Sequence, residues 1–228
     1  MSIEFADRLN NVNFETEEIE LEIINLLESL RNGGERIGRG RTADIYISEK
    51  NPQICYKIIE RRHVFYNFVE IEKKFLEKAR EIDVRVPVPI FSYRKGEYEV
   101  LAMERIGGFS VEDVLFNEIE LPENFNIEFF FRELQKMTDT LHRNRIYHRD
   151  LHEGNVIIEK NGYPCVIDFG SAKNAFSEED SKRSEFYNPE TKKREEVVFA
   201  TTDESNVLEI KLSLKKYIKK QSLTKKNK

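Results

Sequence analysis

Two side chains separated by four residues, Asp150 and Asn155, have the types and spacing that phosphoryl transfer requires. They lie in the stretch YHRDLHEGN, where a loop can aim both side chains at one point. An Asp placed in this way accepts a proton from an attacking hydroxyl, while an Asn binds a magnesium ion that bridges phosphates. Further along, VIDFG places a second carboxylate, Asp168, between an apolar run and a glycine. This pattern indicates a loop that positions a hydroxyl, phosphates and a metal ion.

Both motifs, in this order, resemble the catalytic loop and the metal-binding motif of the protein-kinase superfamily. The resemblance implies that Asp150 and Asn155 are catalytic and that Asn155 and Asp168 bind Mg²⁺ beside ATP. It also implies an α+β, bilobal fold, with a small β-sheet N-lobe that carries one helix and a truncated, mainly helical C-lobe. The expected domains are an N-terminal helical extension (1–34), an N-lobe (35–106), a minimal C-lobe (107–220) and a disordered basic tail (221–228).

The segment ERIGRGRTADIYIS predicts a hairpin with a glycine-rich turn at Gly38 and Gly40. Such a turn lets backbone N–H groups approach phosphate oxygens, although a G-x-G pair alone also suits an ordinary hairpin. The next strand, ICYK, resembles the V-A-I-K strand of the family and implies that Lys57 is catalytic and binds the α- and β-phosphates of ATP. Ala43 stands where the third glycine of the family lies, which removes no phosphate-binding side chain. The same alignment implies an apolar roof over adenine, formed by Ile45 and Cys55.

Residues 63–82 have apolar side chains at helical spacing, which predicts a helix. The resemblance implies that a Glu of this helix pairs with Lys57 and holds it at the phosphates, and the candidates are Glu70 and Glu72. An apolar turn, Phe75 and Leu76, follows Glu72 by three and four residues on the same helix face. This favours Glu72, with Glu70 as the alternative and two solvated helix acids as the third possibility.

Residues 86–93 predict a strand, and EYEVLAMERI predicts another that leads into the hinge of the family. The resemblance implies that Met103 lies at the back of the adenine pocket. It further implies that backbone groups of Glu104 and Ile106 form hydrogen bonds with the base.

Position 152 departs from most eukaryotic protein kinases, which have a Lys on the γ-phosphate two residues after the catalytic Asp. The form D-L-H-x-x-N is similar to atypical and bacterial kinases and to small-molecule phosphotransferases. His152 is expected to supply the same hydrogen bond to the nucleotide, with a charge that depends on pH. Ile157 is expected to form the floor of the adenine pocket. Arg149 favours protein kinases instead, since in that family it contacts a phosphorylated or acidic activation segment.

The segment after Gly170 is rich in Ser and charge, and it ends in Asn188-Pro189-Glu190, which resembles the A-P-E motif of protein kinases. Phosphorylation could order this segment, and a mobile acidic loop fits the sequence equally well. The candidate phosphorylation sites are Ser177, Ser181 and Ser184. Asp203 is expected to brace the backbone of the catalytic loop, and Thr202 or Asp203 is expected to cap the helix that follows.

Helical spacing also predicts a helix over residues 15–31 that packs on the body of the protein, and another over 127–144 that delivers the catalytic loop. Ser110 is predicted to cap a helix between these two. The two cysteines, Cys55 and Cys165, lie in apolar runs and are expected to be buried thiols.

The net charge of −5 divides into +8 over residues 211–228 and −13 over the remainder, which argues against a general nucleic-acid binder. No apolar run is long enough to span a membrane, and the N-terminus lacks the pattern of a cleavable signal peptide. The basic residues 211–228 are typical of a helix end followed by a solvated, disordered tail. The alternative is a weak contact with anionic lipid or an acidic partner.

The expected function is an ATP- and Mg²⁺-dependent Ser/Thr protein kinase. In its small size the chain resembles the compact effector kinases of pathogenic bacteria. This resemblance implies a host protein as the substrate, either a component of the ubiquitin system or a chaperone. The same host protein could also activate the enzyme. We expect a monomer that is cytoplasmic or secreted into the host cytoplasm. The alternatives are a small-molecule kinase and a nucleotide-binding pseudokinase or interaction module.

Overall fold

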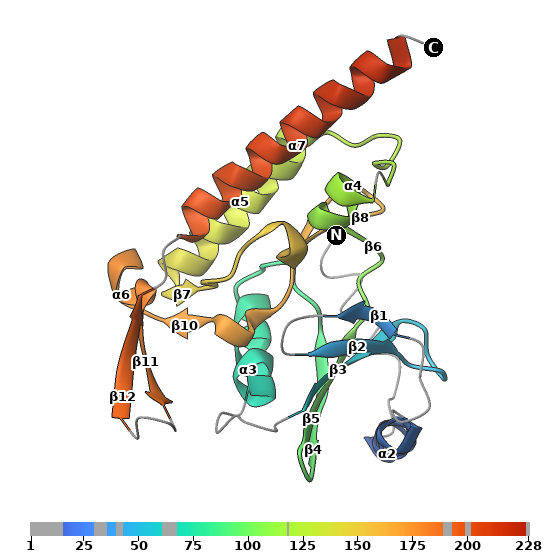
Figure 1. Cartoon of the computed structure of the whole chain (residues 1–228), viewed down its shortest axis with the longest axis vertical. Helices are drawn as coiled ribbons and strands as arrows, with labels where there is room; N and C mark the ends of the chain where they lie inside the picture. The colour runs from blue at the N-terminus through green and yellow to red at the C-terminus, as the bar shows by residue number, and fades with distance from the viewer. Residues whose placement is uncertain are drawn as a thin grey trace. The chain divides into compact units, whose positions relative to one another are not determined.

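A computed structural model describes residues 16–29, 36–39, 43–60, 68–117, 119–188, 193–198 and 202–226 of the chain. The chain divides into two compact units, the first ending at Ile106 and the second beginning at Gly107. An antiparallel sheet dominates the first unit and helices dominate the second (Figure 1). The α+β fold class predicted from the sequence is therefore confirmed. Within the described ranges, no helix has the length and apolar character needed to cross a membrane.

The first unit is built on one antiparallel sheet of five strands in the order β1-β2-β3-β5-β4. Its strands are β1 (Arg36–Arg39), β2 (Asp44–Ile47), β3 (Ile54–Glu60), β4 (Pro89–Lys95) and β5 (Tyr98–Glu104). The predicted hairpin is present as β1 and β2, while Gly40 lies outside the described residues. The strand predicted from Val86 begins only at Pro89, because Pro87 has no N–H and the Val88 N–H donates to the Glu104 carboxylate.

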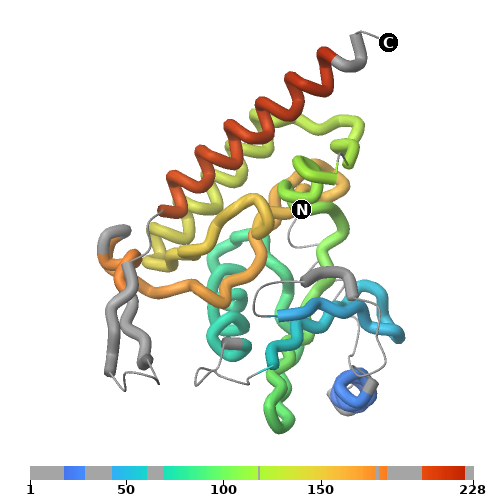
Figure 2. The backbone as a smooth tube through the Cα atoms, viewed as in Figure 1, coloured from blue at the N-terminus to red at the C-terminus, as the bar shows by residue number. Residues whose placement is uncertain are grey.

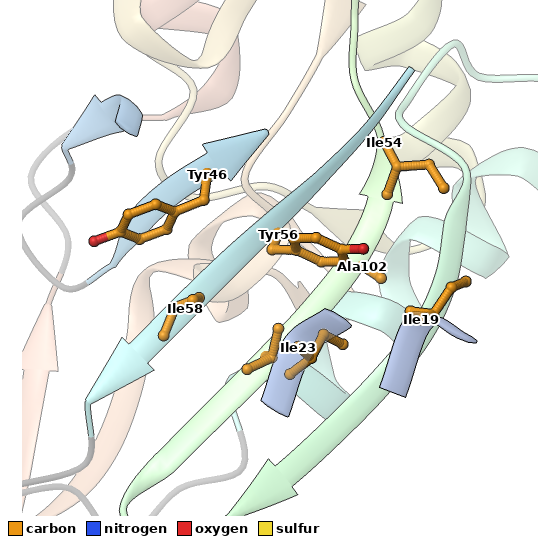
Figure 3. Close-up of a cluster of buried hydrophobic side chains, with 8 residues drawn as sticks. Ile19, Ile23, Tyr46, Ile54, Tyr56, Ile58 and Ala102 are labelled. Atoms are coloured by element: carbon orange, nitrogen blue, oxygen red, sulfur yellow. The ribbon is translucent and has the colours of Figure 1, made fainter. Parts of the chain in front are cut away.

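Strand β3 is buried on both faces, since successive side chains of a strand point to opposite sides. Ile54, Tyr56 and Ile58 share one face, and helix α2 (Thr16–Ser29) covers it with Ile19 and Ile23. Figure 3 shows the two isoleucines of α2 pointing at this face of the sheet. The N-terminal helix expected from the sequence thus completes the core of the first unit, although Leu30 lies outside the described residues.

The carboxylate of Glu22 ties α2 to the sheet. Glu22 accepts hydrogen bonds from the Ser48 hydroxyl at 2.9 Å, the Tyr56 hydroxyl at 2.7 Å and the Glu49 N–H at 2.7 Å. Bonds to a charged acceptor are the stronger class of protein hydrogen bonds. They set the position of α2 along the strands, which apolar packing alone would leave poorly specified.

Helix α3 (Phe68–Glu81) packs against β4 and β5 through an apolar face that includes Phe75, Leu76 and Ala79, all buried. The first residues of the predicted helix, 63–67, lie outside the described part of the chain.

The second unit contains two long helices, α5 (Ile127–Arg143) and α7 (Asp203–Lys226), which run antiparallel side by side (Figure 2). Helix α7 buries Val207, Ile210 and Leu214. The tail expected to be disordered from residue 221 is instead a continuation of α7 to Lys226, because no Gly or Pro interrupts this run.

Helix α4 (Val111–Phe116) begins at the predicted cap: the Ser110 hydroxyl accepts from the Asp113 N–H and the Asp113 carboxylate accepts from the Ser110 N–H. Short strands surround the catalytic loop: β6 (Gly108–Ser110), β8 (Val156–Glu159) and β9 (Pro164–Val166) in one sheet, and β7 (Ile146–Tyr147) with β10 (Lys173–Asn174) in another. The 3₁₀ turns are η2 (Glu153–Asn155) and η3 (Phe169–Ser171).

The segment treated as an activation loop contains regular structure that the sequence did not predict. Helix α6 (Glu178–Lys182) leads into β11 (Arg183–Asn188), which pairs antiparallel with β12 (Lys193–Val198). Pro189 and Glu190, predicted to close the segment, lie outside the described residues.

Candidate active site

Four of the predicted nucleotide-binding side chains share one face of the sheet in the first unit. Strand register pairs Ile45 with Lys57 and Cys55 with Met103, and paired residues of antiparallel strands point the same way. Because Cys55 and Lys57 are two residues apart on β3, all four lie on the face opposite α2. Gly38 pairs with Ile45 at the neighbouring strand.

Lys57 is held by Glu72. The Lys57 Nζ lies 2.7 Å from Glu72 Oε2, and the side chains are only 6% and 1% exposed. Glu70 is exposed and accepts a hydrogen bond from Ser92 instead. The helix face that buries Phe75 and Leu76 therefore also carries Glu72, as its position one turn earlier predicts.

The expected adenine-contacting residues form an apolar wall on this face. Cys55 and Met103 are buried, and burial raises the pKa of the Cys55 thiol to about 12. The thiol therefore stays protonated and acts as an apolar group. Cys55 and Cys165 are both free and buried, as predicted.

Glu104 has a role for its side chain that the sequence reasoning missed. Its buried carboxylate receives both ends of the Arg85 guanidinium, at 2.7 and 2.9 Å, and the Val88 N–H at 3.1 Å. These bonds fix the end of β5, where backbone groups of Glu104 and Ile106 are expected to bind a base. The sequence offered one signal for this role, Arg85 just before the Val-Pro repeat, but it could not show that Glu104, 19 residues further on, is the partner of Arg85.

In the second unit, hydrogen bonds hold the backbone around Asp150 while leaving its carboxylate half exposed. The Asn155 side-chain nitrogen donates to the Asp150 carbonyl at 2.7 Å, and the Asp150 N–H donates to His148 Nδ1 at 3.3 Å. His148 is completely buried and packs edge-on against Phe169 with 4.7 Å between ring centroids. His148 therefore supports the loop and is not placed to transfer protons.

Ile167 ties this loop to Asp168. Its carbonyl lies 2.9 Å from His148 Nε2, and its N–H donates to the Asn155 carbonyl at 3.0 Å. Asp168 itself adopts a left-handed backbone, with φ 63° and ψ 69°, a conformation that Asp tolerates better than most residues. The bond from Ile167 to Asn155 thereby joins the two segments that carry Asn155 and Asp168.

Asp203 braces the loop, as predicted. Its carboxylate accepts from the backbone N–H groups of His148 and Arg149, both at 2.8 Å, and lies 3.1 Å from His142 Nε2. Arg149 has a left-handed backbone, with φ 70°, which these bonds stabilise. Burial alone would raise the pKa of Asp203, but the bonds from His142, His148 and Arg149 hold it below its ordinary value. His142 was not predicted, although it lies in the last turn of the helix that delivers the loop.

The activation segment is anchored by Lys173, whose Nζ donates to the carbonyls of Asp180 and Arg183 at 3.0 and 2.9 Å. Ser177 is exposed and caps α6 by accepting from the Asp180 N–H, whereas Ser181 is buried. The Ser184 side chain lies outside the described residues, and phosphorylation at these sites stays a prediction.

The remaining predicted residues are His152, Ile157 and Ile106. His152 is exposed beside Asp150, Ile157 is half-buried on β8, and Ile106 is half-buried at the end of the first unit. The site residues thus form two groups, one within each unit.

A family model described as "Protein kinase domain" matches residues 32–198. The chain belongs to the protein kinase domain family. It is 27% identical over 153 residues to the "Serine/threonine-protein kinases drp72" of Corynebacterium efficiens, covering 62% of this chain and 29% of that protein. It is 26% identical over 151 residues to the "Serine/threonine-protein kinases PknA" of Corynebacterium glutamicum, covering 61% and 32%. A "Probable serine/threonine-protein kinase KIN1 homolog" of Enterocytozoon bieneusi is 27% identical over 137 residues, covering 59% and 23%. The chain thus matches less than a third of the length of each of these relatives.

Proposed function

We propose that the protein is an ATP- and magnesium-dependent Ser/Thr protein kinase. The observation that carries this proposal is the buried Lys57–Glu72 ion pair at 2.7 Å. Protein kinases need this pair in place to hold the nucleotide phosphates during transfer. The relatives named above are themselves described as Ser/Thr protein kinases, which supports the same acceptor class.

The residues of the second unit suit a magnesium ion. Mg²⁺ prefers oxygen ligands, and Asn155 and Asp168 offer an amide and a carboxylate oxygen. Because the Asn155 nitrogen donates to the Asp150 carbonyl, the amide oxygen is the atom left to face a ligand. Among the described residues, no three His, Cys, Asp or Glu side chains form a metal site by themselves. Phosphate oxygens and water would therefore supply the other ligands, as they commonly do for Mg²⁺.

Each residue has a defined task in this proposal. Lys57 contacts the α- and β-phosphates, and the apolar face with Cys55 and Met103 contacts the adenine. Asp150 orients the acceptor hydroxyl and takes its proton late in the transfer. The bound magnesium ion would neutralise charge that develops on the β- and γ-phosphates. The backbone bonds to Asp203 keep Asp150 in place while its carboxylate exchanges a proton.

One feature favours a second acceptor class. His152, in the form D-L-H-x-x-N, resembles small-molecule phosphotransferases as well as atypical protein kinases. A panel of sugars, choline and aminoglycosides, read by ATP consumption, tests this alternative against protein acceptors. Action as a bacterial effector on a host protein, activation by that protein, a monomeric state and the cellular location all stay predictions.

The proposal is tested with labelled ATP, Mg²⁺ and a generic protein substrate. The wild type should transfer label to protein and to itself, and Asp150→Ala should abolish transfer. Asp139→Ala, which removes an exposed carboxylate from α5, is the matched control and should keep full activity. Equal labelling by wild type and Asp150→Ala would refute the assignment.

Nucleotide binding is measured separately by thermal unfolding. Saturating MgATP at 100 times Kd should stabilise both the wild type and Asp150→Ala by about 2.7 kcal/mol. Binding without transfer in the wild type would instead support the pseudokinase alternative.

A further inference from the structure

The ring of His152 is held in one protonation pattern by the backbone of its own loop. The Gly154 N–H donates to His152 Nδ1 at 3.1 Å, so that His152 caps the 3₁₀ turn η2. A ring nitrogen that accepts a hydrogen bond cannot carry a proton. The cap therefore selects the tautomer that carries its ring proton on Nε2.

Gly154 provides the space for this arrangement. A Cβ atom at this position would lie 2.8 Å from His152 Cε1 and 3.2 Å from Nδ1, and 2.9 Å from Glu112 Oε2. The first of these distances is too short for carbon atoms that are not bonded to each other. The glycine thus serves to let the imidazole lie against the backbone, since any other residue would displace the ring.

The free end of the ring faces the proposed base. His152 Nε2 lies 3.9 Å from Asp150 Oδ1, and both side chains are about half exposed, at 49% and 52%. This distance is longer than a hydrogen bond, but catalytic hydrogen bonds are often long without substrate and shorten in the reacting complex. A small rotation of either side chain would bring the Nε2–H into contact with the carboxylate.

We propose that His152 is a positioning residue for Asp150, whose carboxylate the His152 Nε2–H orients toward the acceptor hydroxyl. This inference rests on the proposed function and changes the expected role of His152, which was contact with the nucleotide. The cap leaves Nε2 as the ring donor, and Nε2 lies 3.9 Å from Asp150 Oδ1.

The tautomer and the contact are measured by ¹⁵N NMR of the histidine rings, a readout that does not depend on activity. The chain has four histidines, and the His152 signals are assigned by comparison with His152→Asn. We expect the Nε2–H tautomer, and we expect Asp150→Asn to shift the His152 ring signals. The control is Glu153→Gln, a neighbouring carboxylate that accepts from Ser213 at 3.2 Å, and it should preserve the tautomer. A proton on Nδ1, or ring signals that ignore Asp150→Asn, would overturn the inference.

Two substitutions separate the cap from the donor in the kinase assay. His152→Asn places an amide oxygen where Nδ1 lies and keeps the cap, but it has no group at the position of Nε2. His152→Gln can place an amide N–H near Nε2 but loses the cap. We expect kcat to fall about tenfold in His152→Asn with little change in KM for ATP, and His152→Gln to restore most of kcat.

The competing role gives the opposite kinetic pattern. If His152 bound the γ-phosphate in the ground state, both variants would raise KM for ATP and leave kcat nearly unchanged, which contradicts the inference. A His152→Asn enzyme equal to the wild type would contradict it as well. A wild type that transfers no phosphate counts against the proposed function, and the NMR experiment still decides the tautomer and the Asp150 contact.

Discussion

Replacing Asp203 with Asn tests whether a buried carboxylate holds the catalytic loop. In the native chain, Asp203 Oδ2 accepts a hydrogen bond from the His148 N–H and lies 3.1 Å from His142 Nε2, while Oδ1 accepts a hydrogen bond from the Arg149 N–H. An Asn can keep its oxygen in the first position, but its NH₂ group then faces the Arg149 N–H. The change therefore removes one charge-assisted hydrogen bond and leaves two donors opposed in a buried place.

The expected cost follows from these contacts. A hydrogen bond to a charged group contributes roughly 1.5–3 kcal/mol, and an unsatisfied buried donor costs roughly 1–3 kcal/mol. Allowing for overlap between the two terms, Asp203→Asn should lower the free energy of unfolding by about 2–4 kcal/mol. For a chain of this size, that corresponds to a fall in Tm of roughly 4–16 °C. The kcat for phosphoryl transfer should fall as well, since Arg149 and Asp150 are neighbours.

The control is Glu204→Gln, because it removes a carboxylate from the same first turn of α7. Glu204 is 60% exposed, and its Oε1 lies 4.0 Å from His142 Nδ1, which is beyond hydrogen-bond distance. Loss of this charge at the helix N-terminus should therefore lower the free energy of unfolding by no more than about 1 kcal/mol. Both variants are compared with the wild type by urea and thermal unfolding monitored by circular dichroism. If Asp203→Asn unfolds together with Glu204→Gln, the carboxylate does not hold the loop and the reasoning is wrong.

The lowered pKa of Asp203 adds a dependence on pH. A carboxyl whose pKa is lower in the folded state stabilises the protein above its unfolded value, about 3.9, and this contribution is lost as the pH falls through the folded value. The stability difference between the wild type and Asp203→Asn should therefore shrink as the pH falls below about 4.

Two further substitutions each have a neighbouring control. Glu72→Gln removes the carboxylate that lies 2.7 Å from the buried Lys57 Nζ, and it should cost about 3 kcal/mol of unfolding free energy and most of the kinase activity. Glu70→Gln, at an exposed position, should cost less than about 1 kcal/mol. Similar urea midpoints for the pair would contradict the role of Glu72. Gly108→Ala would place a Cβ against the carbonyl oxygen of Ile158 on β8, and it should lower the unfolding free energy by about 1–3 kcal/mol. Gly107→Ala, with no atom within 4 Å of its Cβ, should change the unfolding free energy by less than about 0.5 kcal/mol. A Gly108→Ala protein as stable as its neighbour would show that β6 and β8 are not packed so closely.

The catalytic loop was predictable because its information is local. Asp150, Asn155 and Asp168 lie within 19 residues, and their order and spacing alone indicate a proton acceptor beside oxygen ligands. The long helices were predictable for the same reason, since apolar side chains at helical spacing depend on residues three and four apart. The residues expected to contact adenine came from the family resemblance, and the structure shows that Ile45, Cys55 and Met103 share one face of the sheet.

Partnerships between distant residues were decided by the tertiary structure. The choice of Glu72 over Glu70 depends on how α3 is rotated against the sheet, and a helical pattern only favours one face. Asp203 meets His142 across 61 residues, and Arg85 meets Glu104 across 19, on elements brought together by packing.

The sequence by itself thus predicted which chemistry the chain carries: that of a strand lysine, a loop aspartate and two proposed magnesium ligands. Only the tertiary structure decided what holds these groups in place: the Glu72 carboxylate on Lys57, the Asp203 carboxylate under the loop and the Gly154 cap that turns His152 toward Asp150. The physical reason is that the reacting groups are set by short spacings along the chain. The charges and donors that orient them must find partners in the buried interior, and folding alone brings those partners together.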